Sequence, residues 1–315
     1  GLQQEGMMIA RKQFSRIGWA FVAFCLVDLG VQMVFGAWIG VWMLLRDMET
    51  LNIDFLLLAQ ISMYVFAFPI FWILMRRIPA WKKPEGESLG IGQFLLWAVV
   101  CFGLTYLGNF AGQIVMKISE LVTGSFGENP VLDMIDMMNP WMVFLTTVVI
   151  APVMEELMFR KFLIDRIVPY GQKAAVVVSG VAFGLFHGNF YQFFYASFLG
   201  MIFAYLYSST GRLRYNILLH MMINMVGGVV PVMLMQQLDE LSPGAALAFL
   251  GVMIMGIFML ASVIAAIVLI CIFARKLSWF GAWAPASAKG LWRDVLTAPG
   301  VIGFLAVCVM MFFMN

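Results

Sequence analysis

Charged residues are scarce in this chain of 315 residues: they make up 11% of it, whereas hydrophobic residues make up 63%. A soluble domain is closer to half apolar and a quarter charged, so the composition excludes an ordinary soluble protein. The 19 basic and 17 acidic residues nearly balance, and we expect no nucleic-acid partner. The sequence predicts an integral, multi-pass membrane protein surrounded by the lipid bilayer.

Cysteine is also rare. The four cysteines, Cys25, Cys101, Cys271 and Cys308, lie in apolar runs, and none has the spacing of a metal-binding pair. This pattern argues against a disulfide framework or a zinc knuckle. The sequence has no HExxH motif and no internal repeat. The missing repeat weighs against a secondary transporter, since many of these are built from repeats.

Apolar runs, by contrast, fill most of the chain. A transmembrane helix needs about 20 mainly apolar residues, and fewer where protein surrounds it. Nine runs are candidates: 17–45, 55–75, 90–116, 141–164, 174–190, 193–208, 215–235, 247–273 and the short 299–314. We expect an all-α polytopic transmembrane helix bundle of about eight or nine spans. The chain is predicted to divide into three regions: an N-terminal region, 1–140, with three spans; a catalytic four-helix block at 141–235; and a C-terminal region, 236–315, with one or two spans.

The basic residues predict an orientation. If the N-terminus is cytoplasmic and the nine spans alternate, 16 of the 19 lysines and arginines fall in cytoplasmic segments. Only Arg46 and Lys117 fall in loops on the opposite, non-cytoplasmic side of the membrane, and Arg160 lies within a span. Cytoplasmic loops carry an excess of Lys and Arg, so this count supports nine spans with a cytoplasmic N-terminus. The stretch Val131 to Met138 is expected to be a connector or a short surface helix.

Two adjacent glutamates, Glu155 and Glu156, lie inside the apolar run that contains APVMEELMFR. Ionisable residues within a membrane usually face a protein interior or a cavity and mark function. Arg160 follows Glu156 by four residues, so the two share a helix face and are expected to pair. Glu155 is turned away and has no counter-ion in its own helix. Pro152 is expected to kink this helix and open space for water.

The only two histidines also lie in apolar runs, in FGLFH and HMMIN. His220 and Asn224 are four residues apart and share a helix face. A carboxylate, two histidines and an asparagine suffice to activate water and stabilise an oxyanion. Glycines at 180, 184 and 188 form a stripe that lets another helix approach His187 closely.

Other interpretations stay open. Glu156 and Arg160 alone could be a structural ion pair, and each histidine alone could be a hydrogen-bonded core residue. Asp28, in the first span, could join a proton relay or be an aspartate hydrogen-bonded to another helix. The protein could instead be a membrane transporter, in which Asp28, the two glutamates and the histidines relay protons. It could also be a non-catalytic immunity or scaffold protein, in which the buried polar residues are structural.

Taken together, EELMFR, FGLFH and HMMIN resemble the three signatures of the CAAX protease and bacteriocin-processing family, which includes the type II CAAX prenyl endopeptidase. The match covers roughly 141–235. The resemblance implies an intramembrane endopeptidase of a bacterial or archaeal cell membrane. Its peptide or protein substrate would be reached from the membrane or its cytoplasmic face, and whether that substrate is prenylated stays open.

The resemblance also implies roles for single residues. Glu155 would activate the attacking water with help from His187, and His220 and Asn224 would form an oxyanion hole. Glu156 and Arg160 would hold the site in shape. Independently of the resemblance, Phe183 lies one turn before His187 and is expected to pack against that ring and fix it. We favour a mechanism without a cofactor. The alternative is a divalent metal such as zinc, bound by Glu155, His187 and His220.

Overall fold

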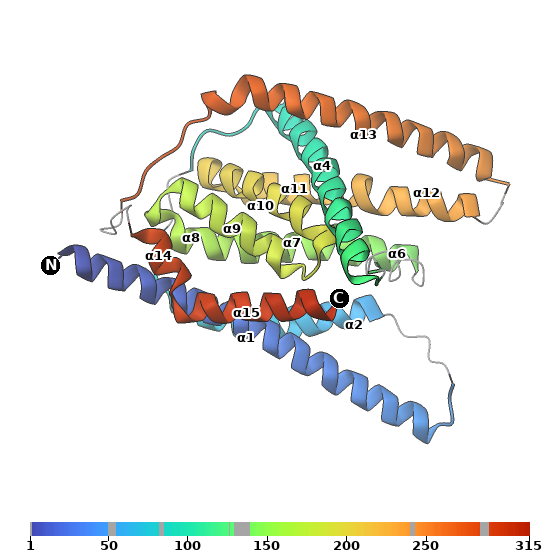
Figure 1. Ribbon diagram of the computed structural model, residues 1–315, viewed down its shortest axis with the longest axis horizontal. Helices are drawn as coiled ribbons and strands as arrows, with labels where there is room; N and C mark the ends of the chain where they lie inside the picture. The colour runs from blue at the N-terminus through green and yellow to red at the C-terminus, as the bar shows by residue number, and fades with distance from the viewer. Residues whose placement is uncertain are drawn as a thin grey trace. The chain divides into compact units, whose positions relative to one another are not determined.

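The computed structural model describes residues 2–49, 55–81, 85–125, 127–128, 139–239, 243–283 and 290–315. Regular structure in these residues is helical throughout, without a strand (Figure 1). Within the described residues, seven helices are long and apolar enough to span a membrane: Ile9–Leu45, Leu56–Met75, Ile91–Thr123, Pro140–Tyr170, Phe190–Thr210, Leu213–Leu238 and Ala245–Lys276. Two apolar helices, Gln172–Phe186 and Pro299–Met314, are shorter. These nine helices confirm the polytopic helical bundle and an integral membrane protein.

The chain forms two compact units, each assembled from separate stretches of sequence. Unit 1 comprises residues 1–80, 138–142 and 284–307, and unit 2 comprises residues 81–137, 143–283 and 308–315. The three regions predicted along the chain, 1–140, 141–235 and 236–315, stay a prediction. The predicted connector or surface helix at Val131 to Met138 lies outside the described residues.

Unit 1 is built on the long helix α1, Leu2–Leu45. It packs against a second helix made of α2 (Phe55–Gln60), the π-helical η1 (Ile61–Ala67) and α3 (Phe68–Met75), and against α14 (Leu291–Leu296). Asp28 of α1 accepts a hydrogen bond at Oδ1 from Ser62 Oγ, at 2.6 Å. This contact bears out the interpretation of Asp28 as an aspartate hydrogen-bonded to another helix.

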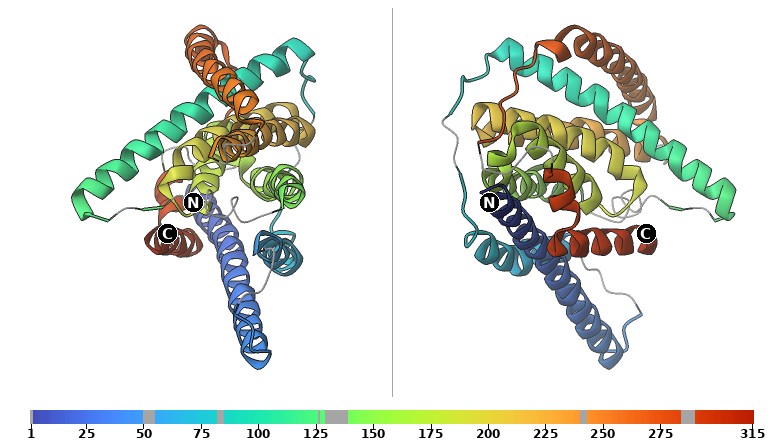
Figure 2. Two further views of the ribbon diagram at one scale, coloured as in Figure 1. Left: turned by 90° about the vertical axis from the view of Figure 1, so that its right-hand side faces the viewer. Right: turned by 60° about the vertical axis from the view of Figure 1, so that its left-hand side comes forward.

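Unit 2 contains the four helical regions of the predicted block, except for residues 140–142 at the start of the first region, which belong to unit 1. The first, 140–170, is α6 (Pro140–Val143), η2 (Phe144–Ile150), α7 (Ala151–Glu156), η3 (Leu157–Phe162), α8 (Leu163–Ile167) and η4 (Val168–Tyr170). Next come α9 (Gln172–Phe186) and α10 (Phe190–Thr210). The last is α11 (Leu213–Asn224), η5 (Met225–Val229) and α12 (Val230–Asp239). Two further helices, α4 (Ile91–Thr123) and α13 (Ala245–Phe273), pack on each other, and α4 also packs on α10 (Figures 1 and 2).

The glycine stripe brings α9 and α10 into contact, as predicted. A Cβ atom on Gly184 would overlap the hydroxyl of Ser197, and one on Gly180 would overlap the side chain of Met201. Gly188 has another function, because it adopts a left-handed conformation with φ of +70° just after α9 ends. Glycine takes this conformation without steric cost, so it terminates the helix and leaves His187 as the C-cap residue.

Candidate active site

Glu156 and Arg160 form a completely buried ion pair in unit 2. Glu156 Oε2 lies 3.1 Å from Arg160 Nε, and both side chains are 0% exposed. The predicted pairing is confirmed. No nitrogen of the guanidinium makes a hydrogen bond within the described part of the chain. The cation is instead held by this opposite charge and by two aromatic faces, with Cζ 4.5 Å from the ring centre of Phe183 and 5.4 Å from that of Phe203.

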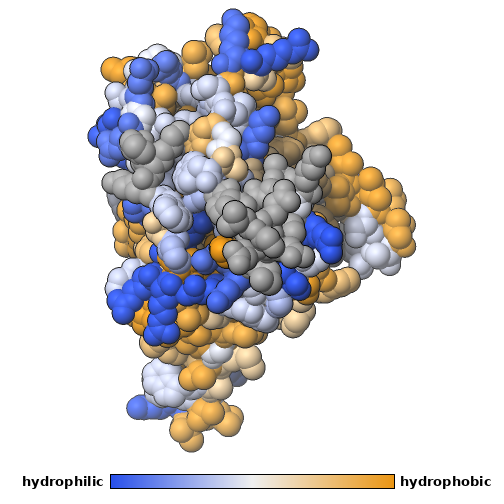
Figure 3. Space-filling model, turned by 90° about the vertical axis from the view of Figure 1, so that its left-hand side faces the viewer, coloured by the Kyte–Doolittle hydropathy of each residue, from blue (hydrophilic) through white to orange (hydrophobic). Residues whose placement is uncertain are grey.

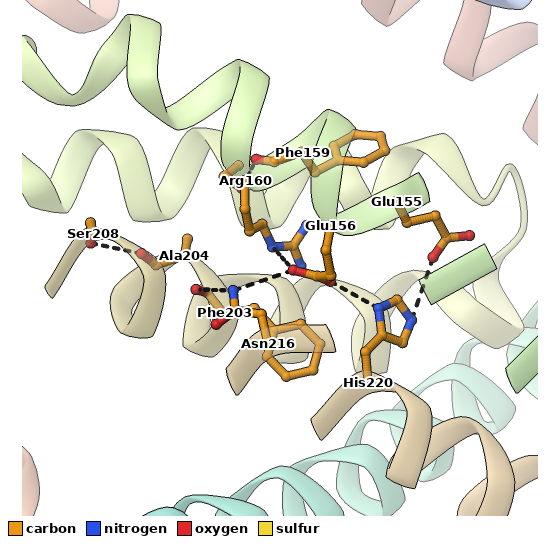
Figure 4. A network of polar contacts seen from close by, with 10 residues as sticks. Glu155, Glu156, Phe159, Arg160, Phe203, Ala204, Ser208, Asn216 and His220 are labelled. Carbon is orange, nitrogen blue, oxygen red and sulfur yellow. Dashed lines mark hydrogen bonds and ion pairs between the residues drawn. The ribbon is translucent and has the colours of Figure 1, made fainter. Parts of the chain in front are cut away.

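His220 of α11 lies between the two glutamates (Figure 4). Its Nδ1 is 2.8 Å from Glu156 Oε1, and its Nε2 is 3.4 Å from Glu155 Oε2. Glu155 lacks a partner in its own helix, as predicted, but α11 supplies one that the sequence did not reveal. A carboxylate accepts hydrogen bonds, so the short contact places a proton on Nδ1 and fixes the ring orientation. Glu155 is 16% exposed, which makes it the more accessible glutamate.

Asn216 is a member of this cluster that the motifs did not reveal. It is completely buried, and its Nδ2 donates to Glu156 Oε2 at 3.3 Å and to the backbone oxygen of Phe203 at 2.7 Å. Both partners are acceptors, which assigns the amide orientation. One signal was present in the sequence, because Asn216 precedes His220 by four residues and therefore shares its helix face.

His187 lies at the end of α9 with its ring orientation fixed locally. Its Nδ1 is 2.7 Å from the backbone oxygen of Phe183, one turn earlier. A carbonyl oxygen only accepts, so Nδ1 carries a proton, and the Nε2 atom of the neutral ring is an acceptor. The ring of Phe183 makes edge contacts with both histidines, at 4.8 Å from His187 and 5.8 Å from His220. Phe183 therefore contacts the His187 ring, as predicted, and the His220 ring as well.

Asn224 lies one turn beyond His220 and faces the helical region that carries the glutamates. Its Nδ2 donates to the backbone oxygen of Thr147 at 2.9 Å. That amide nitrogen carries two hydrogens, and this bond uses one.

π-Helical turns flank the polar cluster on both helical regions. The segments η2 and η3 lie directly before and after α7, which carries both glutamates. The segment η5 begins directly after Asn224. Pro152 sits near the start of α7. The helix therefore changes its winding on both sides of the site, and a kink at Pro152 stays a prediction. Such π-turns interrupt the regular backbone bonding and occur often at functional sites.

Among the described residues, no three side chains of His, Cys, Asp or Glu are grouped so that they could hold a metal ion. This finding includes Glu155, His187 and His220. The choice between a metal-free and a zinc-dependent reaction stays a prediction.

Comparisons with known proteins agree with the geometry. The family model described as "Type II CAAX prenyl endopeptidase Rce1-like" matches residues 137–226, which include every residue of the cluster. The Bacillus subtilis (strain 168) protein named "Putative membrane peptidase YdiL" is 25% identical over 169 residues, covering 53% of this chain and 68% of that protein. No solved structure matches. Over the core that carries the three motifs, these matches support the predicted resemblance to the CAAX protease and bacteriocin-processing family of membrane proteases.

Proposed function

We propose that this protein is an intramembrane endopeptidase in which Glu155 is the general base that activates water. The observation that carries this proposal is the unequal environment of the two glutamates. Glu156 is buried, paired with Arg160 and bound by Asn216 and His220, so its carboxylate is fully engaged. Glu155 is partly exposed, and within the described part of the chain its polar contact is with Nε2 of His220. A base must reach both solvent and substrate, and Glu155 alone meets that condition.

The histidines have complementary roles in this proposal. His187 presents an acceptor at Nε2 and assists Glu155 in taking the proton of the attacking water. His220 is fixed at Nδ1 by Glu156, so its Nε2–H donates to the oxyanion that forms on the scissile carbonyl. Asn224 donates the second hydrogen of its amide to the same oxygen. Preorganised donors of this kind typically contribute 10²–10³ in rate each.

Glu156, Arg160 and Asn216 position these groups without touching the substrate. The proton taken by Glu155 passes to the leaving amine, so water adds across the peptide bond and no metal enters the cycle. The substrate is a peptide or membrane protein entering from the bilayer or from its cytoplasmic face.

The test is cleavage of a pooled peptide library by detergent-purified protein, read by mass spectrometry. Wild type and Glu155→Gln are compared, with Glu120→Gln, near the C-terminal end of α4 and similarly half-buried, as the matched control. Products from wild type and Glu120→Gln that are absent with Glu155→Gln support the proposal. Products of equal abundance from Glu155→Gln contradict it. A proton-coupled flux in liposomes without any cleavage would favour the transporter instead.

A further inference from the structure

Unit 2 has an apolar groove outside the polar cluster, between α4, α10 and α13. It is lined by the face of α4 from Gln93 to Leu104, by Ile202 of α10, and by the end of α13 and the residues after it, from Leu269 to Leu277. Its volume is about 420 Å³, within the range of small-molecule sites. None of the residues proposed for peptide hydrolysis lines it.

The groove has the length of one bilayer leaflet. Its lining residues on α4 extend over eleven helical steps, or about 16 Å along the axis. The hydrocarbon core of a bilayer is about 30 Å thick, so this length is about half of it. Gln93 is the polar residue among the lining residues, and it lies near the N-terminus of α4. The groove is therefore polar at the end near the start of α4 and apolar along the remainder.

Hydrogen bonds connect the helix ends around the polar end of the groove. Tyr215, near the start of α11, accepts a hydrogen bond from Leu89 N just before α4, and Tyr205 of α10 donates to Ser278 O just after α13. Gln172, at the start of α9, donates to Ser208 of α10. Figure 3 views the molecule from the left-hand side of Figure 1. Hydrophilic residues lie at the top of that view, at the level where α13 ends in Figure 1.

Basic and aromatic side chains surround the mouth of the groove. Lys276 Nζ lies 5.4 Å from the ring centre of Phe273, a lining residue. The lining residue Trp97 contacts Tyr205, which contacts Trp279, and Lys173 Nζ lies 5.7 Å from that indole ring. Lys173 and Lys276 are both exposed. Of the acidic residues before α4 at this end, Glu85 is paired with Arg212 at 3.7 Å, and Glu87 is exposed.

We propose that this groove binds one acyl chain of an anionic phospholipid, whose phosphate lies at Lys276 and Lys173. The depth of one leaflet suits a single acyl chain, and the charge at the mouth suits an anionic headgroup rather than a zwitterionic one. Tryptophan and tyrosine at the same level are typical of the headgroup region. The site is independent of the proposed peptidase activity.

Native mass spectrometry of the detergent-purified protein tests the proposal, with dioleoylphosphatidylglycerol and dioleoylphosphatidylcholine titrated separately. The expected result is one molecule of the glycerol lipid retained in preference to the choline lipid. Lys276→Gln should weaken binding of the glycerol lipid about fivefold, because a surface lysine contributes about 1 kcal/mol to binding of an anionic lipid. Binding of the choline lipid should stay unchanged. Lys117→Gln, at the other end of α4, is the matched control.

Ala274→Trp fills the groove and should abolish the retained lipid, whereas Ala261→Trp on the exposed face of α13 should not. Thermal unfolding of each variant shows that it is folded. Equal retention of both lipids by wild type, or equal losses with Ala274→Trp and Ala261→Trp, would overturn the proposal. Displacement of the lipid by an apolar peptide with no headgroup preference would assign the groove to a peptide and also overturn it.

Discussion

The Nδ1 atom of His220 lies 2.8 Å from Oε1 of Glu156, although 64 residues separate them in the chain. This contact joins the helical region that carries both glutamates to α11. It also orients the other ring nitrogen, Nε2, toward Glu155. The buried glutamate thus positions the histidine that we propose as an oxyanion donor.

Glu156→Gln should destabilise the protein, because the buried cation of Arg160 loses its only ion-pair partner among the described residues. Removing one member of a buried pair costs about 3–5 kcal/mol. Thermal unfolding in detergent measures the loss. Glu120→Gln, which breaks the exposed pair with Lys117, should cost less than about 1 kcal/mol.

The double variant Glu156→Gln/Arg160→Met separates stability from activity. Removing both charges should recover much of the stability, while activity stays low because the hydrogen bond that orients His220 loses its charge-assisted strength. Recovery of full activity in this variant would contradict the positioning role of Glu156.

Asn216→Ala should lower kcat with little change in KM. It removes a buried hydrogen bond to a carboxylate, worth about 1.5–3 kcal/mol. If that energy serves to position His220 in the transition state, kcat falls by roughly 10- to 150-fold. Steady-state kinetics on a cleaved peptide measure the change, and Asn109→Ala on the exposed face of α4 is the control. A raised KM with unchanged kcat would show that Asn216 serves substrate binding instead.

Gly184→Ala should push α9 away from α10. The added Cβ would overlap Ser197, and overpacking of this kind costs about 1–3 kcal/mol. Because His187 caps the same helix, activity should fall as well. Gly256→Ala on α13 has nothing within 4 Å of the new atom and should leave stability and activity unchanged.

The orientation of the chain can be checked with single-cysteine variants in a background without the four native cysteines. A membrane-impermeant thiol reagent should label Ser119→Cys, at the end of α4, in intact cells. Ser88→Cys, before α4, should react only after permeabilisation. The reverse pattern would contradict the prediction of a cytoplasmic N-terminus.

Local contacts of the site were predictable from the sequence, and distant ones were not. The Glu156–Arg160 pair follows from a four-residue spacing on one helix, and the packing of α9 on α10 follows from two glycines of the predicted stripe. The contacts of His220 with both glutamates depend on how α11 packs against α7, which no spacing encodes. The place of Asn216 in the cluster depends on the same packing. The π-turns also lie beyond sequence reasoning, because they reflect how the helix accommodates its neighbours.

The central claim is that Glu155 activates the attacking water without a metal. Its most direct test is the rate of cleavage of one identified peptide by wild type, by Glu155→Gln, and by wild type after exhaustive treatment with a chelator. We expect the rate to fall about 10²–10⁴-fold in Glu155→Gln, which is the usual contribution of a general base, and to stay unchanged after chelation. A rate unaffected by Glu155→Gln, or one abolished by the chelator and restored by zinc, would contradict it.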